Sequence, residues 1–206
     1  MSKTINYYNQ HALDYFVQTF DLDNSLNQKM FMHEVKKVGY TNPKMLDVGC
    51  GACRDTFFFN NNGISVYPID ASDELAAIVK EQLGIDIHVM NMSNMSFNQE
   101  FELVWASASI LHLDKEEAKR VMAKCYNALK TSGLFYISVK AKQDKEFSDG
   151  ERYFSYYEKD ELSAMLEDIG FTEKSFWYNC DNLGRPTIWL LRKYRIIHLS
   201  SMHCST

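Results

Sequence analysis

From residue 44 onward, short apolar runs rich in β-branched residues alternate with segments in which apolar side chains recur every three or four positions. The second pattern, seen for instance over 118–129, places one apolar stripe along a helix. Alternation of this kind with short connections predicts a parallel sheet covered by helices on both faces. The expected parallel strands cover 44–49, 64–70, 85–90, 101–106 and 134–140.

The last third of the chain departs from this alternation. Two strand-like runs, 171–179 and 186–194, are separated only by a loop, which predicts a hairpin that closes the sheet with an antiparallel edge. We therefore expect an α/β fold with a doubly wound, mostly parallel sheet of seven strands. Residues 142–157, which are charged and then aromatic, are expected to form a loop over one end of the sheet.

Local signals mark the ends of the expected helices. Asp114 followed three residues later by Glu117 indicates a capped helix start. Gly133 lies just after the same helix and is expected to take the left-handed conformation that often ends a helix. Gly84 and Gly170 occupy the corresponding place after two other helices.

The segments outside the alternation complete the expected organisation. Residues 1–42 carry several aromatic side chains at partly helical spacing, so we expect a helical N-terminal cap that belongs to the same domain. The core of the domain is expected to span 43–195. Residues 196–206 have no clear pattern and are expected to form a tail.

The composition narrows the class of protein. A chain of 206 residues suits one well-packed domain, and its 22 basic and 27 acidic residues give a net charge of −5, which disfavours a dedicated nucleic-acid binder. No apolar run reaches the length of a membrane span, and the N-terminus lacks a signal-peptide pattern. The odd number of five cysteines fits a reducing compartment. We therefore expect a cytoplasmic protein without membrane contact.

The strongest chemical signal is a glycine loop between the first expected strand and the helix after it. Asp47, Gly49 and Gly51 form the pattern Asp-x-Gly-x-Gly at the carboxyl end of the strand, where open parallel sheets bind ligands. The two glycines allow close approach of the backbone to a ligand. Their amides and the following helix N-terminus are expected to supply a positive field.

An acid and an arginine refine the nature of that ligand. Asp70 ends the second strand 19 residues after Gly51, where a carboxylate can accept hydrogen bonds from ribose hydroxyls. The third glycine of a dinucleotide-binding loop is replaced by Arg54, which argues against a nicotinamide cofactor. The acid at Asp47 suits an ammonium group. Together these residues indicate an amino acid joined to a nucleoside.

At this point the chain, over roughly 5–194 and most specifically 44–140, resembles the class I S-adenosylmethionine-dependent methyltransferases. The likeness is to the small single-domain branch that includes tellurite-resistance and related small-molecule methyltransferases. It implies a Rossmann-like sheet and S-adenosyl-L-methionine as cofactor. The resemblance places Asn94 and Met95 at the adenine and the stretch after strand four beneath the methionine moiety. The implied cofactor-binding residues are Asp47, Gly49, Cys50, Gly51, Arg54, Asp70, Ala71, Asn94, Met95, Ala106 and Ser107.

His112, after the fourth strand, is the candidate general base, because histidine titrates near neutral pH. The alternative is a histidine that only bonds a backbone carbonyl. Aromatic and basic residues of the N-terminal segment and the later loops could bind the methyl acceptor. The alternative is that the aromatic residues only pack in the fold and the loop charges are solvated. These acceptor candidates are Tyr7, Tyr15, Arg152, Tyr153 and Arg185.

Other functions were weighed against these residues. Cys50 and Cys53 have metal or redox spacing, but both fall in the glycine loop and lack partner ligands, so no metal is expected. The chain has no Asp/Asn-Pro-Pro-Tyr/Phe motif and no Pro-Cys pair, which disfavours DNA methylation. We expect a monomer or weak homodimer that methylates a small molecule. The alternatives are an NAD(P)-dependent oxidoreductase and a non-catalytic S-adenosylmethionine-binding module that acts with a partner.

Overall fold

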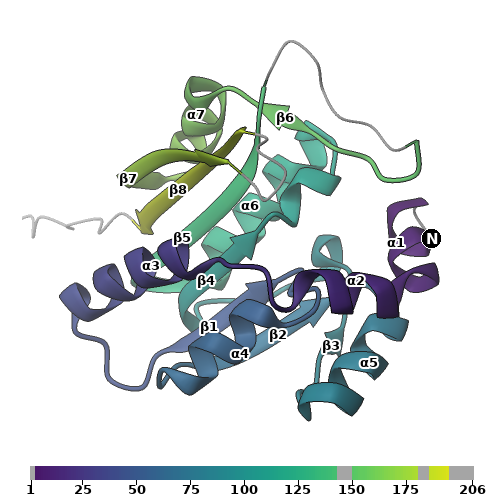
Figure 1. The fold of residues 1–206 in the computed structure, drawn as a ribbon. Helices are drawn as coiled ribbons and strands as arrows, with labels where there is room; N and C mark the ends of the chain where they lie inside the picture. Colours follow the sequence, from purple (N-terminus) through teal and green to yellow (C-terminus); the bar gives the residue numbers. More distant parts are fainter. Residues whose placement is uncertain (1–2, 143–149, 181–185, 195–206) are drawn as a thin grey trace, which may run out of the picture.

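The computed structural model describes residues 3–142, 150–180 and 186–194. A twisted sheet crosses the molecule with helices packed on it (Figure 1). Its main strands follow the spatial order β3-β2-β1-β4-β5-β8-β7. The bounds are β1 Lys44–Val48, β2 Ser65–Asp70, β3 His88–Val89, β4 Phe101–Ser107, β5 Leu129–Ala141, β7 Phe171–Cys180 and β8 Pro186–Tyr194.

The strands from β1 to β5 are parallel, because each connection, which contains a helix or a 3-10 turn, returns the chain to the same end of the sheet before the next strand begins. The helices are α4 Arg54–Asn61, α5 Asp73–Leu83, α6 Lys115–Ala128 and α7 Lys159–Ile169, with short 3-10 turns at η1 Met92–Asn94 and η2 Ile110–His112. The expected α/β fold with a mostly parallel Rossmann-like sheet is confirmed.

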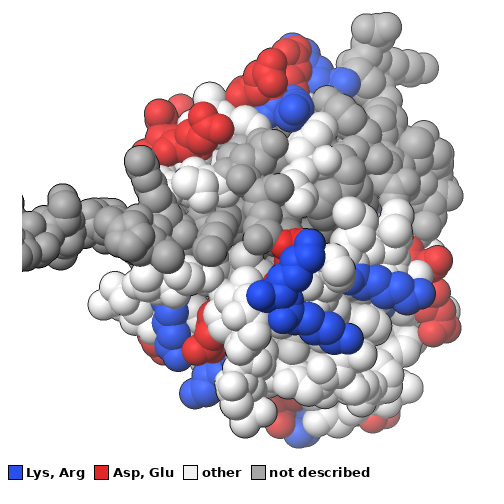
Figure 2. Space-filling view, turned by 90° about the vertical axis from the view of Figure 1, so that its left-hand side faces the viewer, with Lys and Arg blue, Asp and Glu red and all other residues white. Residues whose placement is uncertain are grey.

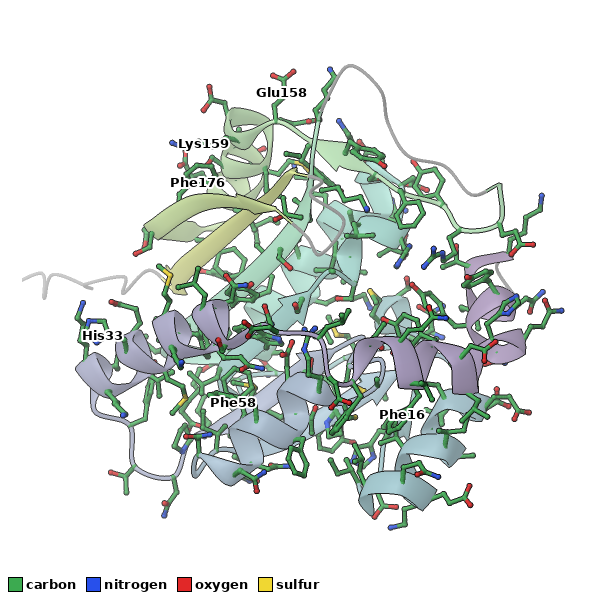
Figure 3. The ribbon with its side chains drawn as sticks, in the orientation of Figure 1. Phe16, His33, Phe58, Glu158, Lys159 and Phe176 are labelled. Carbon is green, nitrogen blue, oxygen red and sulfur yellow. The ribbon has the colours of Figure 1, made fainter. Side chains whose placement is uncertain are left out.

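The expected hairpin is also present. β8 pairs antiparallel with both β5 and β7, so it separates the parallel part of the sheet from the edge. Lys159 Nζ lies 4.4 Å from the ring centroid of Phe176, which links the start of α7 to β7 (Figure 3). The loop expected over 142–157 contains one further short strand, β6 Tyr156–Tyr157, which pairs with the end of β5 beyond β4.

The two faces of the sheet are covered by separate apolar clusters. On one face, α6 and α7 pack their apolar stripes against strand residues that include Leu46, Val104 and Ile137. On the other face, Phe31 and Phe59 bring α3 (Ser25–Val38) and α4 against Met45, Leu103, Trp105 and Tyr136. Adjacent strand residues thus face opposite sides, as the period of two requires. Burial on both faces fixes the register of the central strands.

Helix ends largely follow the expected signals. The Asp114 carboxylate accepts a hydrogen bond of 2.9 Å from the Glu117 amide at the start of α6, and Gly84 and Gly170 take positive φ after α5 and α7. The expectation for Gly133 is wrong. Helix α6 passes directly into β5, and Ser132 is the residue with positive φ, at 65°.

The third expected strand, 85–90, is shorter than predicted, because β3 spans two residues. Residues 3–38 fold into three helices, α1 Lys3–Gln10, α2 Ala12–Thr19 and α3. Helices α1 and α2 lie beside α5 (Figure 1), where the Asn9 side chain bonds Ser72 and Asp73. The tail expected at 196–206 lies outside the described residues. Across the described helices, none has the length and apolar character needed to cross a membrane.

Candidate active site

A cavity of about 470 Å³ lies at the carboxyl ends of β1, β2, β4 and β5. Residues of α1 and α2 form part of its wall, so the cavity lies between the N-terminal helices and the sheet. Its volume falls within the range of roughly 300–1,000 Å³ that is typical of ligand pockets. Its position at the strand ends is where open parallel sheets bind ligands.

The glycine loop forms one wall of this cavity. Gly49 has φ 71°, and a Cβ there would lie 2.5 Å from the Ser109 Cβ, so no larger residue fits. Gly51 has φ 55°, and a Cβ there would lie 3.3 Å from the Tyr15 hydroxyl. The loop amides expected to supply a positive field are already bonded within the protein: those of Gly49 and Cys50 donate to the Ile69 carbonyl at 2.9 and 3.0 Å.

Asp70, the last residue of β2, faces this loop. Its Oδ2 accepts from the Gly51 amide at 3.0 Å and its Oδ1 from the Ser72 amide at 2.9 Å. Burial raises the pKa of the carboxyl, and the two amides oppose that shift by stabilising the charged form. Since each carboxylate oxygen has more than one acceptor position, both can still bind ligand hydroxyls.

Asp47 lies at the end of β1 and lines the cavity, although it is 2% exposed. Its Oδ2 accepts a hydrogen bond of 2.6 Å from the Thr56 hydroxyl. Burial, followed by the nearby charge of Asp55, raises the pKa of Asp47 to about 8. The carboxyl is therefore largely protonated at neutral pH until a cation comes close to it.

Asp55 is the most heavily bonded side chain of the site. Arg54 donates to it twice, from Nε at 3.0 Å and from Nη2 at 2.9 Å. The Asn24 and Gln28 amides and the Trp105 indole N–H donate to it as well, at 2.7 to 3.2 Å. Arg54 and these hydrogen bonds hold the pKa of Asp55 low despite its burial. This carboxylate therefore joins α3, α4 and β4 under the cavity.

At the other side of the cavity, His112 bonds two partners. Its Nδ1 lies 2.8 Å from the Tyr153 carbonyl oxygen and its Nε2 lies 2.9 Å from the Tyr8 hydroxyl. A carbonyl only accepts, so Nδ1 carries the proton, and Nε2 of the neutral ring accepts from Tyr8. Burial raises the pKa of Tyr8, which keeps its hydroxyl protonated.

The structure brings most of the expected site residues to this one cavity. The expected residues that line it are Asp47, Gly49, Cys50, Gly51, Arg54, Asp70, Ala71, Ser107, His112, Tyr15 and Arg152. The expected residues that are not on its wall are Asn94, Met95, Ala106, Tyr7 and Tyr153. Met95 and Ala106 are fully buried in the core instead. Arg185 lies outside the described residues.

Several cavity residues were missed by the sequence analysis, and Asn91, Met92 and Lys140 are three of them. Asn91 and Met92 line the cavity where Asn94 and Met95 were expected. Asn91 lies two residues after β3 and caps the 3-10 turn through its side chain, which accepts from the Ser93 amide. That position shortly after a strand was the available signal. Lys140 near the end of β5 also lines the cavity, and an alternating strand pattern gave no indication of it.

Comparisons with known proteins agree with this geometry. Residues 45–133 match the family model of the methyltransferase domain. An uncharacterized methyltransferase of Staphylococcus carnosus is 24% identical over 172 residues, which cover 81% of this chain and 74% of that protein. A phosphoethanolamine N-methyltransferase of Plasmodium falciparum is 27% identical over 131 residues, which cover 61% of this chain and 48% of that protein.

A solved structure shares the whole architecture. The crystal structure of a Burkholderia thailandensis 1,6-didemethyltoxoflavin-N1-methyltransferase, with 1,6-didemethyltoxoflavin and S-adenosylhomocysteine bound, matches with a TM-score of 0.76. The identity is 16%, and the match covers 93% of this chain and 87% of that one. At this identity the likeness establishes the fold.

The sheet, the glycine loop and these matches support the assignment of the chain to the class I S-adenosylmethionine-dependent methyltransferases. The S-adenosylhomocysteine bound in the Burkholderia structure is consistent with S-adenosyl-L-methionine as the cofactor. The cavity fits that cofactor, because the loop leaves no room for a Cβ at Gly49 and Asp70 stands across the loop with carboxylate oxygens able to accept hydroxyls.

Proposed function

We propose that this methyltransferase acts on a small molecule bound in the same cavity as the cofactor. The observation that carries the proposal is the continuity of the cavity, whose wall includes Asp70 and Gly51 as well as His112 and Tyr8. A donor and an acceptor can therefore meet inside one cavity. The cavity is of a size for two small ligands in contact and is covered by helices, which suits a small acceptor better than a polymer.

The two carboxylates beside the glycine loop, Asp47 and Asp70, would bind different parts of the cofactor. Asp70 binds the ribose hydroxyls, and Asp47 faces the ammonium group, whose charge would favour ionisation of the carboxyl. Asn91 and Met92 replace Asn94 and Met95 as the proposed adenine contacts, since they are on the cavity wall. Cys50, Ala71 and Ser107 contribute the wall around them.

Arg54 keeps its proposed role beside the cofactor carboxylate. Two of its N–H groups already bond Asp55, and a guanidinium has five N–H donors in total. The remaining donors are enough for a carboxylate. The Asp55 contact fixes the direction of the side chain, which lowers the entropy lost when a ligand binds.

For the reaction itself, the cofactor supplies an electrophilic methyl group on a sulfonium. The chain's task is to align and desolvate the reactants, which can account for most of the acceleration. We propose that, as the acceptor attacks the methyl group, its proton passes to the Tyr8 oxygen while the Tyr8 proton passes to Nε2 of His112. The imidazolium that forms keeps its Nδ1–H on the Tyr153 carbonyl.

The other functions considered lose support. The loop position of the third glycine of a dinucleotide site holds Arg54, which is tied to Asp55. Among the described residues on the face in Figure 2, basic and acidic side chains both occur, and the basic ones do not form the continuous surface of a polyanion binder. We retain the expectations of a cytoplasmic location and of a monomer or weak homodimer as parts of the proposal.

The test has two stages. Isothermal titration should detect S-adenosylhomocysteine binding and no comparable binding of NAD⁺ or NADP⁺. Release of S-adenosylhomocysteine from S-adenosylmethionine is then followed across a panel of small hydroxy, amino and thiol compounds. Turnover with a small acceptor supports the proposal, whereas cofactor binding without turnover on any acceptor, including peptides and nucleic acids, would favour the non-catalytic module.

A further inference from the structure

Charged side chains are segregated along the cavity wall. Its four carboxylates all come from the first 70 residues of the chain, and they are Asp23, Asp47, Asp55 and Asp70. Arg54 also lies at this end, where it is paired with Asp55. The two cations at the opposite end are Lys140 and Arg152, and no described lining residue after Asp70 is an aspartate or glutamate. The cavity therefore has an acidic end and a cationic end.

The strand order sets the separation of the two ends. Asp70 ends β2 and Lys140 lies at the end of β5, and β1 and β4 lie between these strands. Three strand spacings of about 4.8 Å place the two ends roughly 14 Å apart. That distance leaves room for a cofactor at the acidic end and a separate acceptor at the cationic end.

The cationic end is a built feature of the fold. Lys140 is only 6% exposed, and its Nζ lies 5.0 Å from the Phe154 ring centroid. The Arg152 guanidinium lies 5.2 Å from the same centroid and 4.6 Å from that of Tyr7. Aromatic faces hold both cations at the wall, and a buried ammonium interacts far more strongly with an anion than an exposed one does.

The part of the wall beside the cationic end is apolar and aromatic. Leu111, Leu113 and Phe154 line it, and the His112 ring lies 5.0 Å from that of Phe154, centroid to centroid. This surface suits an apolar or aromatic body, with the Tyr8–His112 pair beside it.

From this arrangement we infer that the methyl acceptor is a small anion: an apolar or aromatic body with a carboxylate or phosphate that Lys140 and Arg152 bind. The inference rests on the proposed function and adds the class of substrate. A guanidinium binds either anion through two N–H groups, and an ammonium acts as a point charge. Lys140 and Arg152 lie together at one end of the cavity beside Phe154, so they fix the orientation of the anionic group.

The test measures binding to the protein saturated with S-adenosylhomocysteine. The probes are benzoate, phenyl phosphate, the neutral benzamide and the cationic benzylamine, each titrated calorimetrically. We expect at least one of the two anions to bind about ten-fold or more tightly than benzamide, and benzylamine to bind least. The preference between benzoate and phenyl phosphate identifies the anionic group.

Variants tie this preference to the two cations. Lys140→Gln and Arg152→Gln should each reduce the preference for the anion about five-fold or more, while S-adenosylhomocysteine affinity changes less than about two-fold. Lys142→Gln is the matched control, because its side chain is 57% exposed and pairs with Glu158 at 3.4 Å. If Lys140→Gln fails to fold, Arg152→Gln alone decides, since Arg152 is only partly buried.

The outcomes separate the two proposals. Absence of S-adenosylhomocysteine binding overturns the proposed function. Cofactor binding with equal affinity for benzoate, phenyl phosphate and benzamide, or with no anion bound at about 10 mM, overturns the anionic acceptor. An anion preference that survives both substitutions also overturns it.

Discussion

The Tyr8 hydroxyl lies 2.9 Å from Nε2 of His112, although 104 residues separate the two in the chain. The bond connects α1 to the turn η2 after β4, and the Tyr153 carbonyl fixes the opposite nitrogen of the same ring. Both contacts fix the orientation of the His112 ring on the cavity wall. Without α1 the Nε2 atom would lose this partner, so under the proposed mechanism the N-terminal helix contributes to proton transfer as well as to the cover.

We expect His112→Gln to lower kcat by about 10²-fold, because general acid–base groups typically contribute 10²–10⁴. The same substitution should remove the fall of kcat at acidic pH that protonation of a base produces. Tyr8→Phe should lower kcat about 10-fold or more without that change in the pH profile. Steady-state rates from pH 5.5 to 9 provide the measurement.

His88→Gln is the control for these variants. His88 is exposed on β3 and stacks on Tyr67, with ring centroids 3.7 Å apart, away from the cavity wall. Its rate and pH profile should match those of the unchanged protein. An acidic limb that persists in His112→Gln would contradict the assignment of His112 as base.

Asp70→Asn is expected to weaken S-adenosylhomocysteine binding by about 10-fold or more, because a charged acceptor of hydroxyl groups is replaced by a neutral amide. Asparagine is preferred to alanine here, since alanine would leave the Gly51 and Ser72 amides without their acceptor. Titration calorimetry measures the affinity. Asp86→Asn changes an exposed carboxylate, and its affinity should stay within error of the unchanged protein.

Gly49→Ala should destabilise the fold by about 3 kcal/mol or more, because backbone strain adds to a steric clash. The added Cβ would lie 2.5 Å from that of Ser109. Gly63→Ala isolates the strain, since φ is also positive there, at 81°, and nothing lies within 4 Å of the added atom. Its cost should be about 1 kcal/mol by urea unfolding. Equal losses in the two variants would refute the close approach of the loop to Ser109.

The parts of the site that could be predicted are those in which one residue type is required locally. Gly49, Gly51 and Asp70 are adjacent to strand ends, and the backbone conformation or the strand direction determines their position. The sheet could be predicted for a similar reason, because burial on both faces requires continuous apolar runs.

The missed features depend on contacts between distant segments. Whether Asn91 or Asn94 faces the cavity is decided by how the 3-10 turn packs, since both have the same chemistry three residues apart. Lys140 reads as a strand residue, and its role arises only where β5 extends past β4 and Phe154 covers it. Ser132 takes positive φ where Gly133 was expected to, because β5 begins at once after α6. Gly133 is instead needed for space, since a Cβ there would lie 2.9 Å from the carbonyl oxygens of Glu102 and Lys130.

The raised pKa of Asp47 makes stability depend on pH in the direction opposite to that of most carboxylates. The folded protein holds the Asp47 proton up to a pKa of about 8, whereas the unfolded chain releases it near 3.8. Between these values the folded state binds more protons, so the free energy of unfolding falls as pH rises. The contribution is fully present below about pH 4 and is lost as pH rises through 8.

Asp47→Asn should remove this dependence, because an amide does not titrate and can still accept from the Thr56 hydroxyl. We therefore expect the difference in melting temperature, variant minus unchanged protein, to increase with pH when no ligand is present. The increase should be at least about 3 °C between pH 5 and pH 9, which corresponds to roughly 1 kcal/mol. Thermal scans of both proteins across that range measure the difference. Asp86→Asn, with an exposed carboxyl, should give a constant offset. A constant offset for Asp47→Asn as well would contradict the raised pKa, because Asp47 would then be ionised throughout this range in the folded protein.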